Sequence, residues 1–143
     1  IGLFTVTAGT EVDGLVESFK KQGDDYSAML VRFLADRIAE AFAEKLHYDV
    51  RKRYWAYAPD EDNDVERMLR TAYRGRRMAF GYPACPDHSQ KEIVFKLLNV
   101  TQEMGISLTE SYMMQPVSSV CGMFFAHPEI HYFGIGEIGE EQK

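Results

Sequence analysis

The sequence predicts a single α+β domain in which a mainly antiparallel, twisted sheet packs against long helices. Three observations predict it: a β-rich run at the start, helical patterns through the middle, and a last third rich in β-branched and aromatic residues. With 143 residues, the chain is long enough for one core and too short for two.

Composition and charge exclude several classes of protein. No stretch approaches the roughly 20 apolar residues that span a bilayer, and no signal peptide is visible, so we expect no membrane partner. The net charge of -6 argues against a sequence-independent nucleic-acid binder. Cys85 and Cys121 cannot form a disulfide framework, which favours a reducing, cytoplasmic compartment. Because strand-like runs lie at both ends, we expect a piece of a longer protein.

The first predicted elements are a strand and a short helix. Residues 1–8 are largely apolar and suit a strand buried on both faces. Thr10 and Asp13 have the spacing of a capping box, which predicts a helix that ends near Gly23.

Residues 25–57 give the strongest periodic signal, since no Pro or Gly interrupts them. The apolar residues recur at spacings that fit one face of an amphipathic helix about 50 Å long, and we expect this face to pack against the sheet. The stripe consists of Tyr26, Met29, Leu30, Phe33, Leu34, Ile38, Ala41, Phe42, Leu46 and Val50.

A second stripe on the same helix is charged. Asp36, Glu40, Glu44, His47 and Arg51 follow one another at near-regular i, i+4 spacing, which predicts one shared surface. Such a stripe is either a solvated face or an acidic docking surface, and periodicity does not separate the two.

The remaining pattern alternates short elements with one irregular loop. An acidic turn at 60–64 precedes a helix of about ten residues that runs through Arg70. Residues 73–88 read as a shaped loop, and 89–98 as a helix capped by Asp87 or Ser89, followed by a single turn that closes at Gly105. We expect strands at 107–113, 117–126 and 130–138, the last two joined as a hairpin through 127–129.

The side-chain types alone make the loop from Arg74 to Tyr82 a candidate ligand-binding site. Its clustered guanidinium groups suit bidentate binding of a carboxylate, and Tyr82 suits packing on an organic ring. The alternative is a structural loop whose arginines pair with nearby acids. No glycine-rich nucleotide motif and no nucleophile elbow is visible.

A zinc site is the alternative metal chemistry. Cys85, His88, His127 and His131 have zinc-like spacings. The second pair lies on a predicted β-turn, where i, i+4 spacing does not place both rings on one face, and two prolines flank Cys85. We therefore expect no metal site.

Five segments carry a family resemblance. They are GDDYSAMLVRFLADRIAEAFAE, YWAYAPDE, YRGRRMAFGYPACPDH, LTESYMM and HPEIHYFGIGEI. Together they closely resemble, in the same order and over essentially all of the chain, the C-terminal reactivation domain of cobalamin-dependent methionine synthases. The matches at GYPACPDH and ADRIAEAFAE are more specific than any single short motif.

The resemblance implies a function. Enzymes of this family move a methyl group from methyltetrahydrofolate to homocysteine through cobalamin, which is occasionally oxidised to an inactive state. Rescue takes an electron from a flavodoxin-like reductant and a methyl group from S-adenosylmethionine. The resemblance implies that this domain binds S-adenosylmethionine and docks over the cobalamin-binding domain, which itself holds the cobalamin, so that the domain supplies proximity and orientation.

The resemblance also implies residue roles in ligand binding. Arg77 matches the arginine that holds the methionyl carboxylate, and Ala79 matches a position whose backbone contacts the ligand. Tyr82 matches the tyrosine near the transferable methyl group. Tyr132 and Phe133 match an aromatic pair that closes the pocket.

Docking and departures from the family pattern follow from the same resemblance. Asp36 and Glu40 match acids that face the cobalamin domain. The family often has Pro at Met78 and Phe80, and a carboxylate at Thr71. Its aspartate for the ligand's amino group lies upstream of residue 1, so we expect this chain to be a fragment whose pocket is incomplete and which is inactive by itself. The alternatives are a docking module with little ligand affinity and a free-standing zinc protein.

Overall fold

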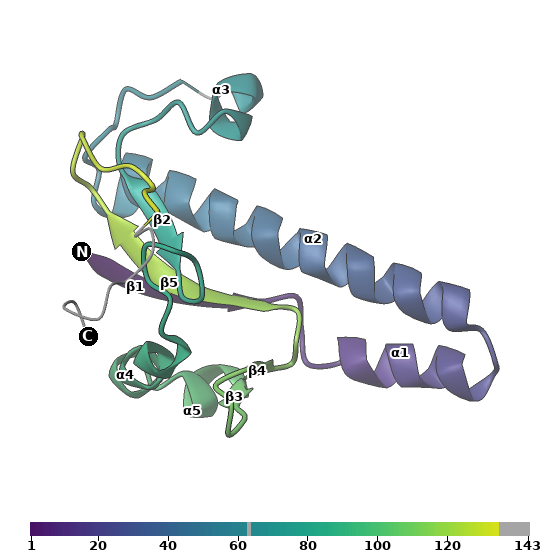
Figure 1. Cartoon of the computed structure of the whole chain (residues 1–143). Helices are drawn as coiled ribbons and strands as arrows, with labels where there is room; N and C mark the ends of the chain where they lie inside the picture. The colour runs from purple at the N-terminus through teal and green to yellow at the C-terminus, as the bar shows by residue number, and fades with distance from the viewer. Residues whose placement is uncertain (63, 135–143) are drawn as a thin grey trace.

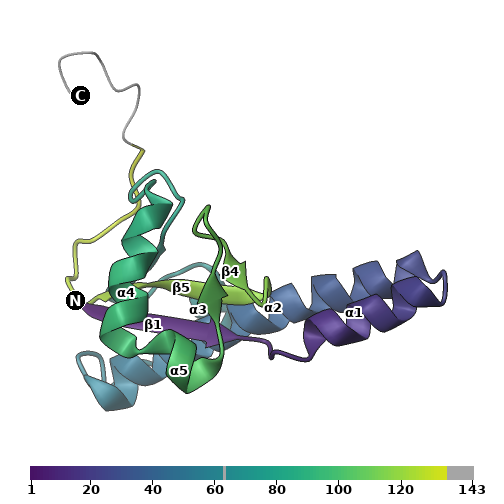
Figure 2. The same cartoon turned by 90° about the horizontal axis from the view of Figure 1, so that it is seen from below.

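The computed structural model describes residues 1–62 and 64–134. Three strands form the main sheet, α2 covers one of its faces, and α4 and α5 cover the other (Figures 1 and 2). The elements are β1 (Gly2–Thr7), α1 (Val12–Lys21), α2 (Asp25–Asp49), the π-helix η1 (Val50–Tyr54), α3 (Val65–Leu69), β2 (Arg76–Ala79), the 3-10 helix η2 (His88–Gln90), α4 (Lys91–Leu98), α5 (Val100–Met104), β3 (Ser107–Leu108), β4 (Met114–Gln115) and β5 (Ser119–Phe125). The expected α+β class is confirmed.

The main sheet is antiparallel, in the order β1-β5-β2. Strand β5 lies in the centre, where Gly122 pairs with Phe4 on one side and with Ala79 on the other. The sequence-based expectation of a loop throughout 73–88 is wrong at β2. The missed signal is the alternation of Met78 and Phe80, which are both buried while their neighbours are partly exposed.

Each face of the sheet carries its own core. On the α2 side, Phe4 stacks on Phe124 with ring centroids 4.4 Å apart. That cluster consists of Phe4, Val6, Ala43, Val50 and Phe124. The opposite cluster consists of Phe80, Val94, Phe95, Val100, Ile106 and Cys121. Strand β1 contributes Phe4 and Val6 to the first cluster, and its Leu3 packs against the second, so the expected burial of the first strand on both faces is confirmed.

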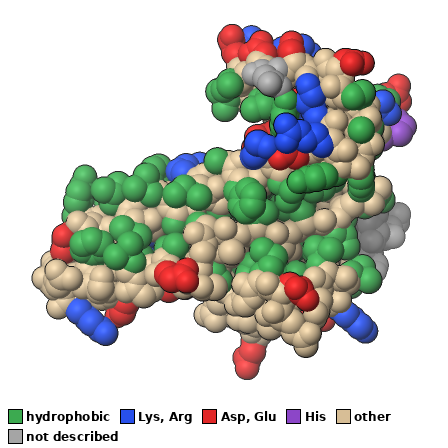
Figure 3. Space-filling view, turned by 180° about the vertical axis from the view of Figure 1, so that it is seen from behind, with side chains coloured by type: hydrophobic (Ala, Val, Ile, Leu, Met, Phe, Trp, Pro, Cys, Tyr) green, Lys and Arg blue, Asp and Glu red, His purple; other side chains and the backbone are tan. Residues whose placement is uncertain are grey.

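Helix α2 begins where expected and continues into η1. The predicted apolar stripe packs against the sheet at Leu46 and Val50, but along the rest of the helix it does not. Its buried residues are Ala28, Ala35, Ala39, Ala43 and His47. The large apolar residues Tyr26, Met29, Leu30, Phe33, Leu34, Ile38 and Phe42 are exposed. The physical reason is close approach: α1 and the sheet lie so near to the α2 axis that alanine fits the seam. Figure 3 shows hydrophobic side chains gathered along the projecting arm that α1 and α2 form.

Several smaller expectations differ from the structure. The capping box expected at Thr10 and Asp13 is wrong: the N-cap residue of α1 is Glu11, which makes no side-chain capping bond, and Asp13 pairs with Arg32 of α2 at 2.6 Å. Helix α3 is half the expected length. Of the strand expected at 107–113, only β3 forms. A turn follows in which the Thr109 hydroxyl accepts from the Met113 amide, and β4 begins after the expected range.

The C-terminal end also differs. Strand β5 and the Asp87-capped helical segment are confirmed. The expected hairpin is not: residues 126–134 contain no strand, and 135–138 lie outside the described residues. No helix in the described ranges is both long and apolar enough to cross a membrane.

Candidate functional site

Strand β2 places Arg77 and Ala79 on the same side of the sheet. Arg77 lies opposite Phe124 in the strand register, and Ala79 lies opposite Gly122. Because Phe124 belongs to the core beneath α2, the side chains of Arg77 and Ala79 also project toward α2. Two of the expected ligand residues are thus brought together by strand periodicity.

The backbone of β2 faces a free edge at the same residues. The Tyr132 hydroxyl donates a hydrogen bond to the Arg77 carbonyl, which therefore points away from β5. The Met78 carbonyl points the opposite way, since a Cβ built on Gly122 of β5 would lie 2.2 Å from it. Backbone groups alternate along a strand, so the N–H and C=O of Ala79 also point to the edge where Tyr132 lies.

Two glutamates of α2 lie beside the guanidinium of Arg77, and only one of them accepts a hydrogen bond from it. Its Nη1 donates to Glu44 Oε2 at 2.9 Å, and its Nη2 lies 3.9 Å from Glu40 Oε2. The Nε–Nη2 edge, the pair of N–H groups that can bind a carboxylate bidentately, has no hydrogen-bond partner among the described residues. The same edge of Arg51 is filled, because it donates to both oxygens of Glu61 at 2.7 Å each.

The Glu44 that binds Arg77 belongs to a buried network of charged side chains. Arg51 is fully buried and its guanidinium carbon lies 3.7 Å from the centroid of the Tyr73 ring. The Tyr73 hydroxyl donates to Glu44 Oε2 at 3.4 Å. Burial and the neighbouring Glu44 raise the pKa of Tyr73 to about 12, so the phenol stays protonated as a donor.

The charged stripe of α2 is therefore not one exposed surface. His47 is fully buried between Phe124, with ring centroids 4.9 Å apart, and Tyr73, at 5.3 Å. Burial, together with the charges of Arg51 and Arg77, lowers the pKa of His47 to about 3, so the ring is neutral. The solvated-face interpretation is wrong for His47 and Arg51, and the sequence contains no signal that separates them from Asp36 and Glu40.

Of the aromatic residues expected at the site, Tyr132 contacts the β2 edge through its hydrogen bond to Arg77. Tyr82, Tyr132 and Phe133 are all about half exposed. Tyr82 lies in the turn after β2, where it forms a bridge with Cys85. Partial burial raises the pKa of the Tyr132 phenol, an effect to which the charge of Tyr82 adds while Arg77 opposes it.

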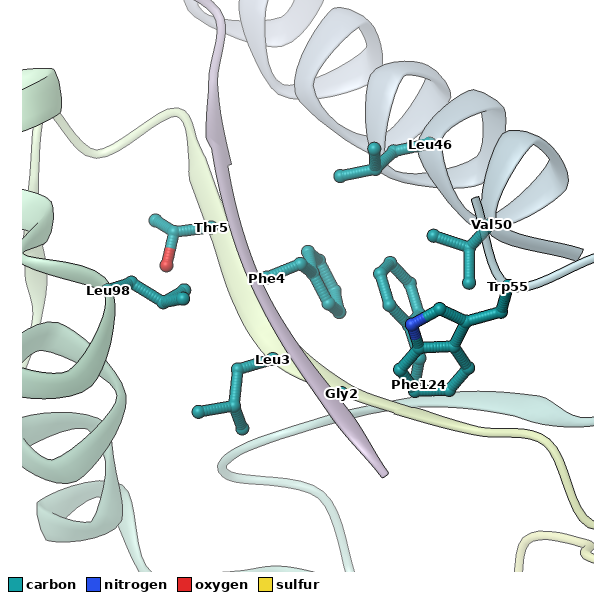
Figure 4. A pocket seen from close by; sticks show the side chains of 9 residues that line it. All are labelled: Gly2, Leu3, Phe4, Thr5, Leu46, Val50, Trp55, Leu98 and Phe124. Carbon is teal, nitrogen blue, oxygen red and sulfur yellow. The ribbon is translucent and has the colours of Figure 1, made fainter. Parts of the chain in front are cut away.

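A cavity of about 420 Å³ lies beside Arg77, between α2 and α3. Its lining is apolar at Ala41, Val65, Met68 and Leu69 and polar at Glu40, Glu44, Lys45, Thr71 and Arg77. Figure 3 shows the hollow beneath the lobe that carries α3, with charged side chains at its mouth. The smaller cavity in Figure 4, about 300 Å³, lies at the β1 edge near Trp55 and contains none of the expected site residues.

The two expected docking acids lie on α2 next to this site. Asp36 accepts a 2.6 Å hydrogen bond from the Ser118 hydroxyl, whereas Glu40 is half exposed. Glu40 also approaches Arg77, so it lies beside one of the residues expected to bind the ligand.

The residues of the alternative zinc site have other contacts. Lys91 Nζ lies 2.8 Å from His88 Nδ1, and the His127 ring accepts from the Glu129 amide. Cys85 is a free, partly buried thiol whose pKa is raised by burial. Within residues 1–62 and 64–134, no three His, Cys, Asp or Glu side chains are grouped so that they could hold a metal ion.

The whole chain, residues 1–143, matches the model of the family described as "Vitamin B12 dependent methionine synthase, activation domain". A crystal structure described as the MetH reactivation domain bound to AdoHcy is 48% identical, with a TM-score of 0.94. That match covers 98% of this chain and 43% of the chain in the crystal structure.

Proposed function

The chain belongs to the family of activation domains of vitamin B12-dependent methionine synthases, and we propose from this that it binds S-adenosylmethionine at the free edge of β2. The bound molecule is presented to a cobalamin that a partner domain holds. The methyl group then serves the reductive reactivation of the enzyme. The AdoHcy in the similar crystal structure, which differs from S-adenosylmethionine only by the methyl group, supports this ligand class.

The open Nε–Nη2 edge of Arg77 is the observation that carries the proposal. A guanidinium binds a carboxylate best through two parallel N–H···O bonds. Glu44 accepts a hydrogen bond from Nη1, and the Nε–Nη2 edge makes none, although Glu40 lies 3.9 Å from Nη2. In Arg51 the same edge donates to both oxygens of a carboxylate, that of Glu61. The methionyl carboxylate of S-adenosylmethionine has the matching chemistry.

The surrounding residues fit the rest of the ligand. The outward N–H and C=O of Ala79 offer one donor and one acceptor, and the methyl side chain leaves room for close approach. Tyr82, Tyr132 and Phe133 offer aromatic surface that can cover the ligand.

The chemistry of transfer belongs to the ligand and its acceptor. S-adenosylmethionine supplies an electrophilic methyl group on a sulfonium centre. This chain's residues bind and orient: Arg77 fixes the carboxylate end, Ala79 fixes the ligand against the strand, and the aromatic residues exclude water. Such positioning converts an encounter of two molecules into a reaction within one complex.

The partners follow from the same proposal. Asp36 and Glu40 dock the cobalamin-binding domain, and a flavodoxin-like reductant supplies the electron in the cytoplasm. The exposed carboxylate of Glu40 next to Arg77 supports a docking surface that adjoins the ligand. We also propose that the methyltransferase activity belongs to the whole enzyme and that this chain alone is inactive.

A docking module with little ligand affinity is the second candidate. The observation that favours it is that Arg77 already pairs with Glu44 and approaches Glu40, so a ligand has to share the guanidinium with internal acids.

Titration calorimetry on the intact protein that contains this chain separates the two candidates. We expect saturable binding of S-adenosylmethionine and much weaker binding of 5′-methylthioadenosine, which has the adenosyl thioether but no carboxylate. If S-adenosylmethionine gives no saturable signal, the docking module remains and the proposed function is wrong.

A further inference from the structure

We propose that Glu44 is a positioning residue: it holds the Arg77 guanidinium, before the ligand arrives, in the orientation that presents its Nε–Nη2 edge to the methionyl carboxylate. This inference rests on the proposed function. It adds a residue of α2 to a proposed site whose ligand-binding residues otherwise lie on β2, in the turn after it and in the C-terminal segment.

The contacts of Glu44 fix both of its oxygens. Oε2 accepts from Arg77 Nη1 at 2.9 Å and from the Tyr73 hydroxyl at 3.4 Å. Oε1 is buried and faces Arg51 Nη1 at 3.9 Å, a charge contact without a hydrogen bond. The carboxylate is only 26% exposed, and it cannot turn away from Arg77 without losing these partners.

The partners of Glu44 are themselves fixed. Arg51 is fully buried, and both oxygens of Glu61 hold its bidentate edge. The Tyr73 ring packs against the Arg51 guanidinium. The charges alternate along Glu61, Arg51, Glu44 and Arg77, so each group is attracted by its neighbour and the chain of contacts ends at the ligand arginine.

Positioning matters because a free arginine side chain has many rotamers. An immobilised long side chain costs binding free energy when the ligand has to order it, and preorganisation removes that cost. Glu44 does this through Nη1, the nitrogen that the bidentate edge does not use. Glu40 lies farther away, at 3.9 Å from Nη2, and is half exposed, so it holds the guanidinium less firmly.

The test compares variants at position 44 in the intact protein, by calorimetry with two ligands. Glu44→Ala removes the contact, Glu44→Asp keeps the charge but shortens the reach, and Glu44→Gln keeps an acceptor oxygen at the same place. We expect Glu44→Ala and Glu44→Asp to weaken S-adenosylmethionine binding by roughly 2- to 13-fold, the affinity equivalent of ordering one long side chain. Glu44→Gln should stay within about twofold of wild type.

The second ligand, 5′-methylthioadenosine, reports any effect that does not act through the carboxylate. Its affinity should be the same in all four proteins, because it does not use Arg77. Glu40→Ala is the matched control on the same helix and should lose less affinity for S-adenosylmethionine than Glu44→Ala.

The outcomes separate the inference from the proposed function. If wild type binds S-adenosylmethionine, Arg77→Ala weakens it, and Glu44→Ala and Glu44→Asp do not, the inference alone is wrong. Equal losses for both ligands would show that Glu44 only supports the fold, which also overturns it. If wild type does not bind S-adenosylmethionine, the proposed function fails and the inference fails with it.

Discussion

Replacement of Arg77 by alanine removes the group that we propose for the methionyl carboxylate, and its cost can be worked out from the surroundings. Losing one partner of a desolvated, hydrogen-bonded charge pair typically costs about 2–5 kcal/mol, a factor of roughly 30 to several thousand in affinity. Glu44 and Glu40 stay behind, on the side where the guanidinium stood. Because they then repel the incoming carboxylate, we expect a loss in the upper half of that range.

Arg77→Lys should recover only part of the affinity. An ammonium group keeps the positive charge and can still pair with Glu44, but it cannot present two parallel N–H groups to one carboxylate. Its affinity for S-adenosylmethionine should therefore lie between those of wild type and Arg77→Ala.

Calorimetry of the intact protein with S-adenosylmethionine measures these differences, and 5′-methylthioadenosine is the control. The control ligand should bind wild type and both variants equally, since it has no carboxylate. Wild-type affinity of Arg77→Ala for S-adenosylmethionine would refute the assignment. A loss of the same size for the control ligand would refute the argument as well, because it would place the defect in the fold.

Three further predictions concern stability and docking. Glu61→Ala should lower the free energy of unfolding, measured by urea titration, by about 3–5 kcal/mol, because it leaves the buried Arg51 without its bidentate partner. A loss below about 1 kcal/mol, which is typical of a solvent-exposed ion pair, would contradict this. The pKa of His47 is lowered from 6.5 in the unfolded chain to about 3 in the folded one, so the unfolded chain is protonated first as the pH falls. The free energy of unfolding should therefore fall by about 1.4 kcal/mol per pH unit between pH ~6.5 and pH ~3. His47→Phe should flatten that slope, and an unchanged slope would assign it to other groups. Asp36→Lys combined with Glu40→Lys should slow reactivation of the oxidised intact enzyme, and an unchanged rate would return both acids to a solvated surface.

Local patterns predicted the elements that depend on local physics. The absence of Pro and Gly between 25 and 58 predicted a long helix, and Asp24, as its N-cap residue, accepts from the Ser27 amide at 2.9 Å. The apolar stripe was misread because periodicity identifies a face but not the distance to what packs on it. Alanines at 28, 35, 39 and 43 let α1 and the sheet come close, and this leaves Phe33 and Ile38 outside.

In the candidate site, too, residue types were predictable from the sequence, whereas features that depend on tertiary packing were not. Arginine chemistry pointed to the loop from Arg74 to Tyr82, and the family resemblance singled out Arg77 within it. Strand β2 was not predicted because it has only four residues and pairs with a strand more than forty positions away. The spacing of Asp36, Glu40 and Glu44 correctly places them one turn apart along one side of α2. It cannot show that this side rotates inward toward its C-terminal end, where Glu44 contacts Arg77 and His47 and Arg51 are fully buried. One regular stripe therefore has the partly buried Asp36 and the half-exposed Glu40 at one end. At the other end it has the contact of Glu44 with Arg77 and the buried His47 and Arg51.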